Sequence, residues 1–310
     1  MTSPAAPLTP PAPAAGDGTA LAEHFEFGAN WRRFLADVDE GRVAEAEASL
    51  RRLLALDGPR PLEGVRFLDA GCGSGLFSLA AWRLGADVTA FDFDPESAAC
   101  CRELRRRFGE GDRRWRVEVG SVLDADFLAS LGHFDVVYSW GVLHHTGAMW
   151  PAVEAAAGRA GPGGRFVVAL YNDQGRLSEL WAAIKDGYRR LPRWLRGPYA
   201  YGVGAAYFGG KAVGKAALWP VRWLDRGGVR AGRPEAFAGV ARSGDRGMSR
   251  RHDLVDWVGG WPFEVATPDE TVEFLSERGF VVERMRTVGG RMGCNEVVVR
   301  RLRSNAEPPV

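Results

Sequence analysis

Apolar runs of strand length alternate with amphipathic runs of helix length along the middle of this chain. Strands are expected at 65–70, 87–93, 114–122, 134–140 and 165–171, and helices between them at 76–85, 95–109, 125–132 and 149–160. The strands are nearly continuously apolar, which is typical of strands that are covered on both faces. The pattern therefore predicts an α/β protein with a doubly wound parallel sheet.

The alternation stops after residue 173 and resumes near the C-terminus. A helix is expected at 267–279, opened by Thr267 and Pro268, and two strands follow at 280–288 and 295–301. The residues GGRMG between these strands form a short turn, so the two strands must be antiparallel. We therefore predict a seven-stranded, mostly parallel sheet with an antiparallel last strand.

The segments outside this sheet differ in composition. Residues 1–18 are rich in proline and alanine and are predicted to be a disordered tail, with a second tail at 304–310. Residues 19–60 are predicted to be helical, with one apolar face that contains Val43, Leu50, Leu53 and Leu54. The core is expected at 61–173 and 265–303. Residues 174–264 contain no clear strand and are predicted to be a helical lid over the substrate, inserted after the fifth strand.

Charge and cysteine content exclude several classes of protein. The net charge is +1 and no run of 18 apolar residues exists, so neither a polyanionic partner nor a spanning helix is indicated. The four cysteines form no CxxC pair, which argues against a zinc site or a disulfide framework. The N-terminus lacks the basic and apolar regions of a signal peptide. A cytoplasmic location is expected.

The stretch LDAGCGSG, which begins at Leu68, carries the first chemical signal. Three glycines in five residues after a strand allow a tight turn and a close approach of a ligand. The next helix offers free N–H groups, and Asp92 at the end of the second strand suits ribose hydroxyls. The glycine spacing is GxGxG, and Leu76 stands where a nicotinamide-binding fingerprint has its third glycine. Asp69, two residues before the first glycine, suits a free amino group on the ligand. Together these features favour a nucleoside cofactor that carries such an amino group.

This stretch resembles motif I of class I S-adenosylmethionine-dependent methyltransferases of the small-molecule type. The later stretches AFDFD, GSVLD, DVVYSWGVLHH and GPGGRFVV match further motifs of that family, in the same order along the chain. The resemblance implies a Rossmann-like fold and S-adenosyl-L-methionine as cofactor. It also implies that the cofactor contacts Asp69, Gly71, Cys72, Gly73, Gly75, Asp92, Phe93, Ser121, Val122, Ser139 and Trp140. Because relatives often carry an acid at position 121, Asp124 is an alternative contact for the adenine amino group.

Two adjacent histidines follow the fourth strand, at the end where the reactive methyl is implied. Methylation of a hydroxyl requires a base, and His144 and His145 are the candidate catalytic residues. The sequence does not separate them, and either could instead support the loop. Candidate acceptor contacts are Tyr171, Asn172, Asp256 and Glu264. No set of metal ligands is present, and no metal is predicted.

The insertion is rich in basic and aromatic residues, and three interpretations compete for it. It is a lid around an aromatic or apolar acceptor, or a surface helix that uses Lys211 and Lys215 to touch a membrane or lipid-like substrate. The third interpretation, a nucleic-acid groove, is disfavoured by the near-neutral charge.

The sequence therefore predicts a methyltransferase that uses S-adenosylmethionine on a small-molecule acceptor, with O-methylation favoured over N- or C-methylation. Two alternatives come from other classes: a nicotinamide-dependent oxidoreductase and a non-catalytic partner protein that binds S-adenosylmethionine. Among methyltransferases, a prenyl or lipid-like acceptor and an RNA acceptor remain alternatives.

Overall fold

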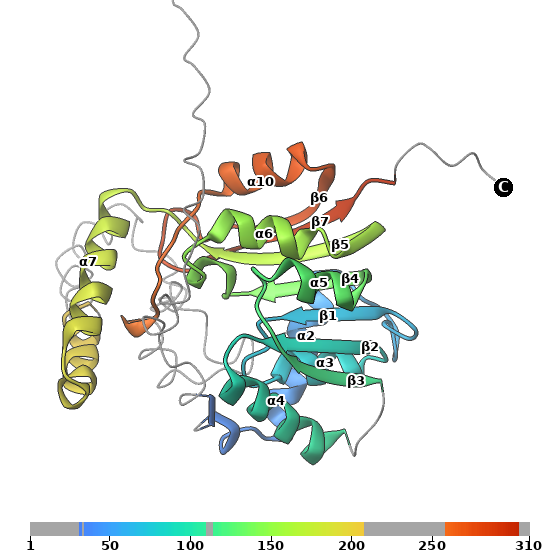
Figure 1. The fold of residues 1–310 in the computed structure, drawn as a ribbon, viewed down its shortest axis with the longest axis horizontal. Helices are drawn as coiled ribbons and strands as arrows, with labels where there is room; N and C mark the ends of the chain where they lie inside the picture. Colours follow the sequence, from blue (N-terminus) through green and yellow to red (C-terminus); the bar gives the residue numbers. More distant parts are fainter. Residues whose placement is uncertain (1–30, 33, 110–113, 208–257, 304–310) are drawn as a thin grey trace, which may run out of the picture.

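The computed structural model describes residues 31–32, 34–109, 114–207 and 258–303 (Figure 1). Asp256, Lys211, Lys215 and both predicted tails lie outside the described residues. The strands are β1 (Arg66–Ala70), β2 (Asp87–Asp92), β3 (Trp115–Val119), β4 (Phe134–Trp140), β5 (Ala160–Tyr171), β6 (Phe280–Arg286) and β7 (Cys294–Arg301). The helices are α2 (Glu40–Leu54), α3 (Leu76–Arg83), α4 (Pro95–Phe108), α5 (Ala125–Leu131), η2 (Leu143–His145), α6 (Met149–Ala157), α7 (Arg176–Arg190) and α10 (Pro268–Glu277).

The seven strands form one sheet in the order β3-β2-β1-β4-β5-β7-β6. Strands β1 to β5 run parallel, whereas β7 pairs antiparallel with both β5 and β6. The predicted mixed sheet is therefore confirmed. The chain reverses its direction of travel across the sheet between β1 and β4, and ligands bind beside the carboxyl ends of strands at such a point.

Two apolar cores cover the two faces of the sheet. Helices α2, α3 and α4 pack on one face, where Phe67, Leu79 and Trp115 are fully buried. Helices α5, α6 and α10 cover the other face over Leu68, Val137 and Phe166 (Figure 1). Residues that alternate along β1, such as Phe67 and Leu68, thus enter opposite cores, which explains why the strand is apolar throughout.

The structure differs from the sequence pattern in two details. The GPGG stretch does not separate α6 from the fifth strand, because β5 already begins at Ala160 and contains it. The pairing with β4 shifts register between Phe134 and Val136, and such an irregularity accommodates Pro and Gly within a strand. In α2 the buried face consists of Val43, Ala46, Leu50 and Leu54, whereas Leu53 is half-buried.

The start of the predicted insertion is helical. Helix α7 follows β5 at the carboxyl end of the parallel strands, and residues 193–207 are also helical (Figure 1). Tyr188 of α7, Ala200 and Val258 form a small apolar cluster of their own. Within the described ranges no helix is long and apolar enough to cross a membrane.

Candidate functional site

The glycine loop between β1 and α3 has a backbone that only glycine accommodates. Gly71, Gly73 and Gly75 have φ angles of 80°, 52° and 84°, in the left-handed region. A Cβ atom at position 71 would lie 2.4 Å from a methyl carbon of Val142, and one at position 75 would lie 2.6 Å from the sulfur of Cys101. At position 73 the Cβ would meet the indole ring of Trp31 at 2.8 Å. The loop is therefore packed closely on both sides.

Asp69, the fourth residue of β1, is buried beneath this loop, with 3% of its surface exposed. The hydroxyl of Ser78 in α3 donates a hydrogen bond of 2.5 Å to its Oδ2 atom. Burial raises the pKa of Asp69 to about 7, although the Ser78 bond opposes the shift and the charge of Asp92 adds to it. A buried carboxyl with a pKa near neutrality is suited to pair with a cationic ligand group.

Asp92 ends β2 and joins the glycine loop to the start of α4. Its Oδ2 atom accepts the N–H of Gly73 at 2.9 Å, and its Oδ1 atom accepts the N–H of Asp94 at the same distance. Desolvation raises the pKa of Asp92 to about 6, against the effect of these two bonds. Since each carboxylate oxygen has two lone pairs, both oxygens retain capacity for a further donor such as a ribose hydroxyl.

The other predicted cofactor residues surround these two acids at the ends of β2 and β3. The Phe93 side chain is 44% exposed, which leaves ring surface for a flat ligand, and Val122 is buried. The Ser121 hydroxyl accepts the N–H of Leu123, while Asp124 caps α5 by accepting the N–H of Phe127. Asp124 thus caps α5, and its role as the alternative adenine contact stays a prediction.

Cys72 lies in the glycine loop beside Cys101 of α4. A hydrogen bond between the two thiols and the burial of Cys72 hold its pKa well above the ordinary value. A thiol that stays protonated is a poor nucleophile, so this position serves packing and backbone geometry.

Ser139 and Trp140 at the end of β4 are held by other strands. The Ser139 hydroxyl is buried and donates to the carbonyl oxygen of Ala70 at 2.8 Å. The Trp140 indole N–H donates to Oε1 of Glu296 in β7 at 2.9 Å. Trp140, Ala169 and Glu296 occupy one row across β4, β5 and β7, and the small side chain of Ala169 lets the indole reach β7.

The two candidate histidines form most of the short helix η2, and each has a different hydrogen-bond partner. His144 is fully buried, and its Nδ1 atom accepts the backbone N–H of Tyr171 at 3.4 Å. That bond requires the proton of neutral His144 to be on Nε2. Burial, and then the charges of His145 and Lys185, hold the pKa of His144 well below its ordinary value. His144 is therefore a neutral donor.

His145 has the opposite arrangement. Its Nδ1 atom lies 2.6 Å from the carbonyl oxygen of Pro262, which can only accept. The proton of neutral His145 is therefore on Nδ1, and Nε2 carries the basic lone pair. The rings of both histidines pack against Tyr171, with centroid distances of 4.0 Å for His144 and 5.4 Å for His145.

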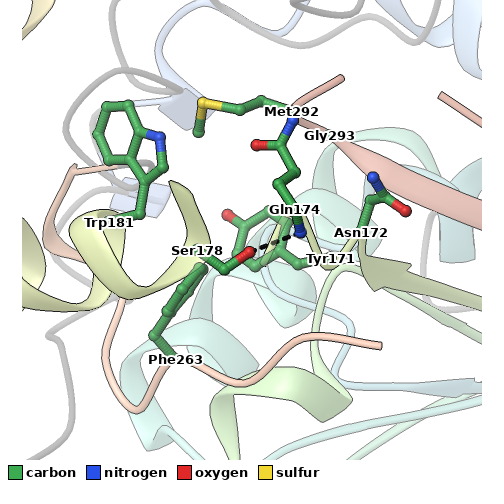
Figure 2. Close-up of a pocket in the computed structure, with 8 residues that line it drawn as sticks. All are labelled: Tyr171, Asn172, Gln174, Ser178, Trp181, Phe263, Met292 and Gly293. Carbon is green, nitrogen blue, oxygen red and sulfur yellow. Dashed lines mark hydrogen bonds between the residues drawn. The ribbon is translucent and has the colours of Figure 1, made fainter. Parts of the chain in front are cut away.

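A pocket opens beside Tyr171 at the end of β5, and Figure 2 shows the residues that line it. They are Tyr171, Asn172, Gln174, Ser178, Trp181, Phe263, Met292 and Gly293. Two predicted acceptor contacts, Tyr171 and Asn172, are thus brought together with aromatic side chains from α7 and from residue 263. Asn172 also has a structural role, since its amide accepts from Asn295 at 2.8 Å and donates to the carbonyl oxygen of Arg291.

Glu264 connects the loop after the insertion to α6. Its Oε1 atom accepts the N–H of Met149, the first residue of α6, and its own N–H donates to the carbonyl oxygen of His144. Burial raises the pKa of Glu264, and backbone bonds from Met149 and Gly147 oppose that shift. Glu264 therefore braces the histidine segment, and it does not line the pocket described above.

Sequence reasoning missed Lys185 of α7. This side chain is buried, with 1% of its surface exposed, and its ammonium lies over the rings of Tyr171 and Phe263. The available signal was composition: the chain has only three lysines, Lys185, Lys211 and Lys215, whereas nearly all its other cationic side chains are arginines. In the described ranges, no group of three or more His, Cys, Asp or Glu side chains is arranged to hold a metal ion.

The sheet order and the glycine loop define the class I methyltransferase fold. A solved structure of magnesium protoporphyrin IX methyltransferase from Synechocystis PCC 6803, with bound S-adenosylmethionine, has this fold. It covers 94% of this chain and 100% of its own chain, with a TM-score of 0.51 and 12% identity. At that identity, the likeness supports the fold alone.

Residues 68–168 match the model of a protein family described as a methyltransferase domain. Ubiquinone biosynthesis O-methyltransferases are similar over the same region. That of Brucella ovis is 33% identical over 145 residues, or 46% of this chain and 55% of that protein. That of Cereibacter sphaeroides is 31% identical over 140 residues, or 45% of this chain and 53% of that protein. The match thus spans about half the length of these relatives.

The chain therefore carries a class I S-adenosylmethionine-dependent methyltransferase domain at residues 68–168. This finding confirms the resemblance that the glycine loop indicated. It contradicts the alternative of a nicotinamide-dependent oxidoreductase, whose loop would also have required glycine in place of Leu76.

Proposed function

We propose that this protein transfers the methyl group of S-adenosylmethionine to a hydroxyl of a small-molecule acceptor. The observation that carries the proposal is the pair of acids, Asp69 and Asp92, beside the glycine-rich loop at the point where the sheet order reverses. This pair lies within the region that matches the methyltransferase family.

The residues at this end of the sheet fit such a cofactor. Asp69 would pair with the ammonium of its methionine part, because that carboxyl is poised to ionise near pH 7. Asp92 would accept the ribose hydroxyls, and the exposed ring of Phe93 would lie against the adenine. When bound, the cofactor supplies a methyl group on a positively charged sulfur with a neutral leaving group.

His145 is the proposed proton acceptor. The transfer forms a bond between the acceptor oxygen and the methyl carbon and breaks the bond from that carbon to sulfur, while the hydroxyl proton moves to Nε2 of His145. The carbonyl oxygen of Pro262 holds the proton of the free imidazole on Nδ1, which leaves Nε2 basic. His144 does not suit this task, because its Nε2 atom carries a proton and burial disfavours a second one.

The acceptor is proposed to bind in the pocket at the end of β5. Tyr171, Phe263 and Trp181 present aromatic surface there, and Asn172 adds a polar group (Figure 2). This lining favours a flat or partly apolar molecule over a polymer. The names of the similar relatives support O-methylation as the reaction. None of the four cysteines, all within the described ranges, forms a disulfide, which fits a reducing cytoplasm.

Calorimetry with S-adenosylhomocysteine and NADH tests the cofactor. We expect S-adenosylhomocysteine to bind the wild type, to bind the D92A variant much more weakly, and NADH not to bind. Firm binding of NADH alone would overturn the proposal. The reaction is tested by incubating the protein with S-adenosylmethionine and a panel of phenols, catechols and hydroxyquinones and measuring S-adenosylhomocysteine release. Tight cofactor binding with no release across the panel would favour the non-catalytic alternative.

A further inference from the structure

Met292 lines the proposed acceptor pocket from the turn between β6 and β7. Residues 289–291 of this turn are exposed, whereas Met292 is half-buried, and its side chain extends toward the Trp181 indole (Figure 2). Gly289 and Gly290 have φ angles of 58° and 73°, which let the chain reverse its direction here. The turn therefore brings a flexible apolar side chain to a pocket whose other large apolar side chains are aromatic.

Amide side chains hold this turn in place. The Nε2 atom of Gln174 donates a hydrogen bond of 2.8 Å to the carbonyl oxygen of Gly290. Asn295 in β7 is buried, and its Oδ1 atom accepts the N–H of Val288 at 3.1 Å. Its Nδ2 atom donates to Oδ1 of Asn172 at 2.8 Å. Because buried amides rarely leave such bonds unmade, this network fixes the turn against the residues that follow β5.

The space that the lining side chains leave for an acceptor is small. It measures about 280 Å³, including the part that is open to solvent. Sites for small molecules typically measure about 300 to 1,000 Å³, so this pocket lies at the lower end of that range. An acceptor wider than one aromatic ring would therefore bind only if a side chain of the wall moved.

The side chains of the wall differ in their freedom to move. Trp181 is buried, and the Tyr171 ring packs against both histidine rings of η2. The Phe263 ring packs on Tyr171, with a centroid distance of 5.6 Å. Methionine, in contrast, is unbranched and rotates about several side-chain bonds, so it adapts to the shape of its neighbours. Met292 is therefore the wall residue that can best yield to an acceptor or resist one.

We propose that Met292 determines the size of the acceptor, and that the pocket takes a single aromatic ring that carries the reacting hydroxyl, in preference to fused rings. The inference rests on the proposed function, because it places that ring in the acceptor pocket of a methyltransferase. Met292 acts by contact with the acceptor. Asn295 does not line the pocket and is a positioning residue, because it acts only by holding the turn.

Aromatic alcohols of increasing width test the size limit. The protein saturated with S-adenosylhomocysteine is titrated by calorimetry with phenol, 2-naphthol and 2-phenanthrol. Because wider ring systems are also more apolar, the ratio of the 2-naphthol Kd to the phenol Kd is compared between variants. M292A should lower this ratio about 10-fold, equivalent to about 1.4 kcal/mol, because the shorter side chain leaves room for a second ring. We expect 2-phenanthrol to bind M292A more tightly than the wild type. An unchanged ratio in M292A would overturn the inference.

Further variants assign the effect to the side chain and to its anchor. M292I introduces a branched, stiffer side chain that cannot turn aside, so it should raise the ratio. M285A is the control, because Met285 of β6 is 47% exposed and does not line the pocket. N295A should lower the ratio as M292A does, because the turn loses its anchor. A purely structural role of Asn295 would lower the melting temperature and leave the ratio unchanged. M292A and M292I decide the role of Met292 even if N295A does not fold.

The outcomes separate this inference from the proposed function. Binding of S-adenosylhomocysteine and a normal melting temperature show that each variant is folded and that the cofactor site is intact. Failure of the wild type to bind S-adenosylhomocysteine would contradict the proposed function. Normal cofactor binding with the same ratio in M292A and the wild type would contradict only the role of Met292. If the wild type with bound S-adenosylhomocysteine takes up none of the three alcohols, the pocket is not a site for aromatic alcohols and the inference is wrong.

Discussion

The hydroxyl of Ser78 in α3 donates a hydrogen bond of 2.5 Å to Oδ2 of Asp69 in β1, and both side chains are buried. This contact fixes the carboxyl group under the glycine loop, at the carboxyl end of the first strand. It also counteracts the burial that raises the pKa of Asp69, so it helps to keep that pKa close to neutrality.

Replacing Ser78 with alanine should therefore destabilise the protein and make Asp69 harder to ionise. Because the buried carboxyl of Asp69 loses the hydroxyl donor of Ser78, we expect the free energy of unfolding to fall by about 1–3 kcal/mol. Urea unfolding at pH 7 measures this change. S130A, at an exposed serine whose hydroxyl donates to the carbonyl oxygen of Phe127, is the control and should cost less. Equal losses would contradict a special role for the Ser78 bond.

Stability without cofactor should depend on pH. The pKa of Asp69 is raised from 3.8 to about 7, and that of Asp92 from 3.8 to about 6. At a pH between 3.8 and the raised value, each carboxyl keeps a proton in the folded state that it has released in the unfolded state. The free energy of unfolding should therefore decrease as the pH rises from about 4 to about 7. Denaturant unfolding at several pH values in this range measures the effect. The free energy of unfolding should depend less steeply on pH in D69N than in the wild type. The same pH dependence in both proteins would exclude Asp69 as a source of the effect.

Cofactor affinity should change in the opposite direction with pH. If ionised Asp69 pairs with the ammonium of S-adenosylhomocysteine, the affinity should increase as the pH passes through about 7, where Asp69 loses its proton. Calorimetric titrations between pH 6 and pH 8 measure this effect. D69N should bind weakly and with little dependence on pH, and a strong dependence in D69N would point to another titrating group.

The glycine at position 75 should not tolerate a side chain. Its φ angle is 84°, and an added Cβ would lie 2.6 Å from the sulfur and 2.9 Å from the Cα atom of Cys101. G75A should therefore lower the free energy of unfolding by about 1–3 kcal/mol through overpacking, beyond the backbone strain. Gly141 offers a matched control, because its φ is 76° and its Cβ would meet nothing within 4 Å. G141A should cost only the strain, about 1 kcal/mol.

Substitution of the two histidines should change kcat to different extents, measured with an acceptor identified from the panel. H145N keeps a donor near the Nδ1 position for the carbonyl oxygen of Pro262 but removes the basic Nε2 atom, so we expect kcat to fall about 100-fold with little change in melting temperature. H133N, at an exposed histidine, is the control. A larger loss of kcat in H144Q than in H145N would assign the base to His144 instead.

The sequence by itself determined the order of the elements, the mixed sheet and the place of the cofactor loop. These features depend on local signals: continuous apolar strands, a glycine stretch after the first strand, and an acid at the end of the next. A parallel sheet then brings Asp69 and Asp92 to one edge, because the carboxyl ends of parallel strands lie together.

Only the tertiary structure decided what the individual side chains do. The roles of His144 and His145 differ because one contacts the backbone of Tyr171 and the other that of Pro262, which is 117 residues away in the chain. The α7 pattern likewise did not reveal that Lys185 is buried against Phe263. Hydrogen bonds and desolvation depend on atoms contributed by distant segments, and periodicity along the chain carries no information about those partners.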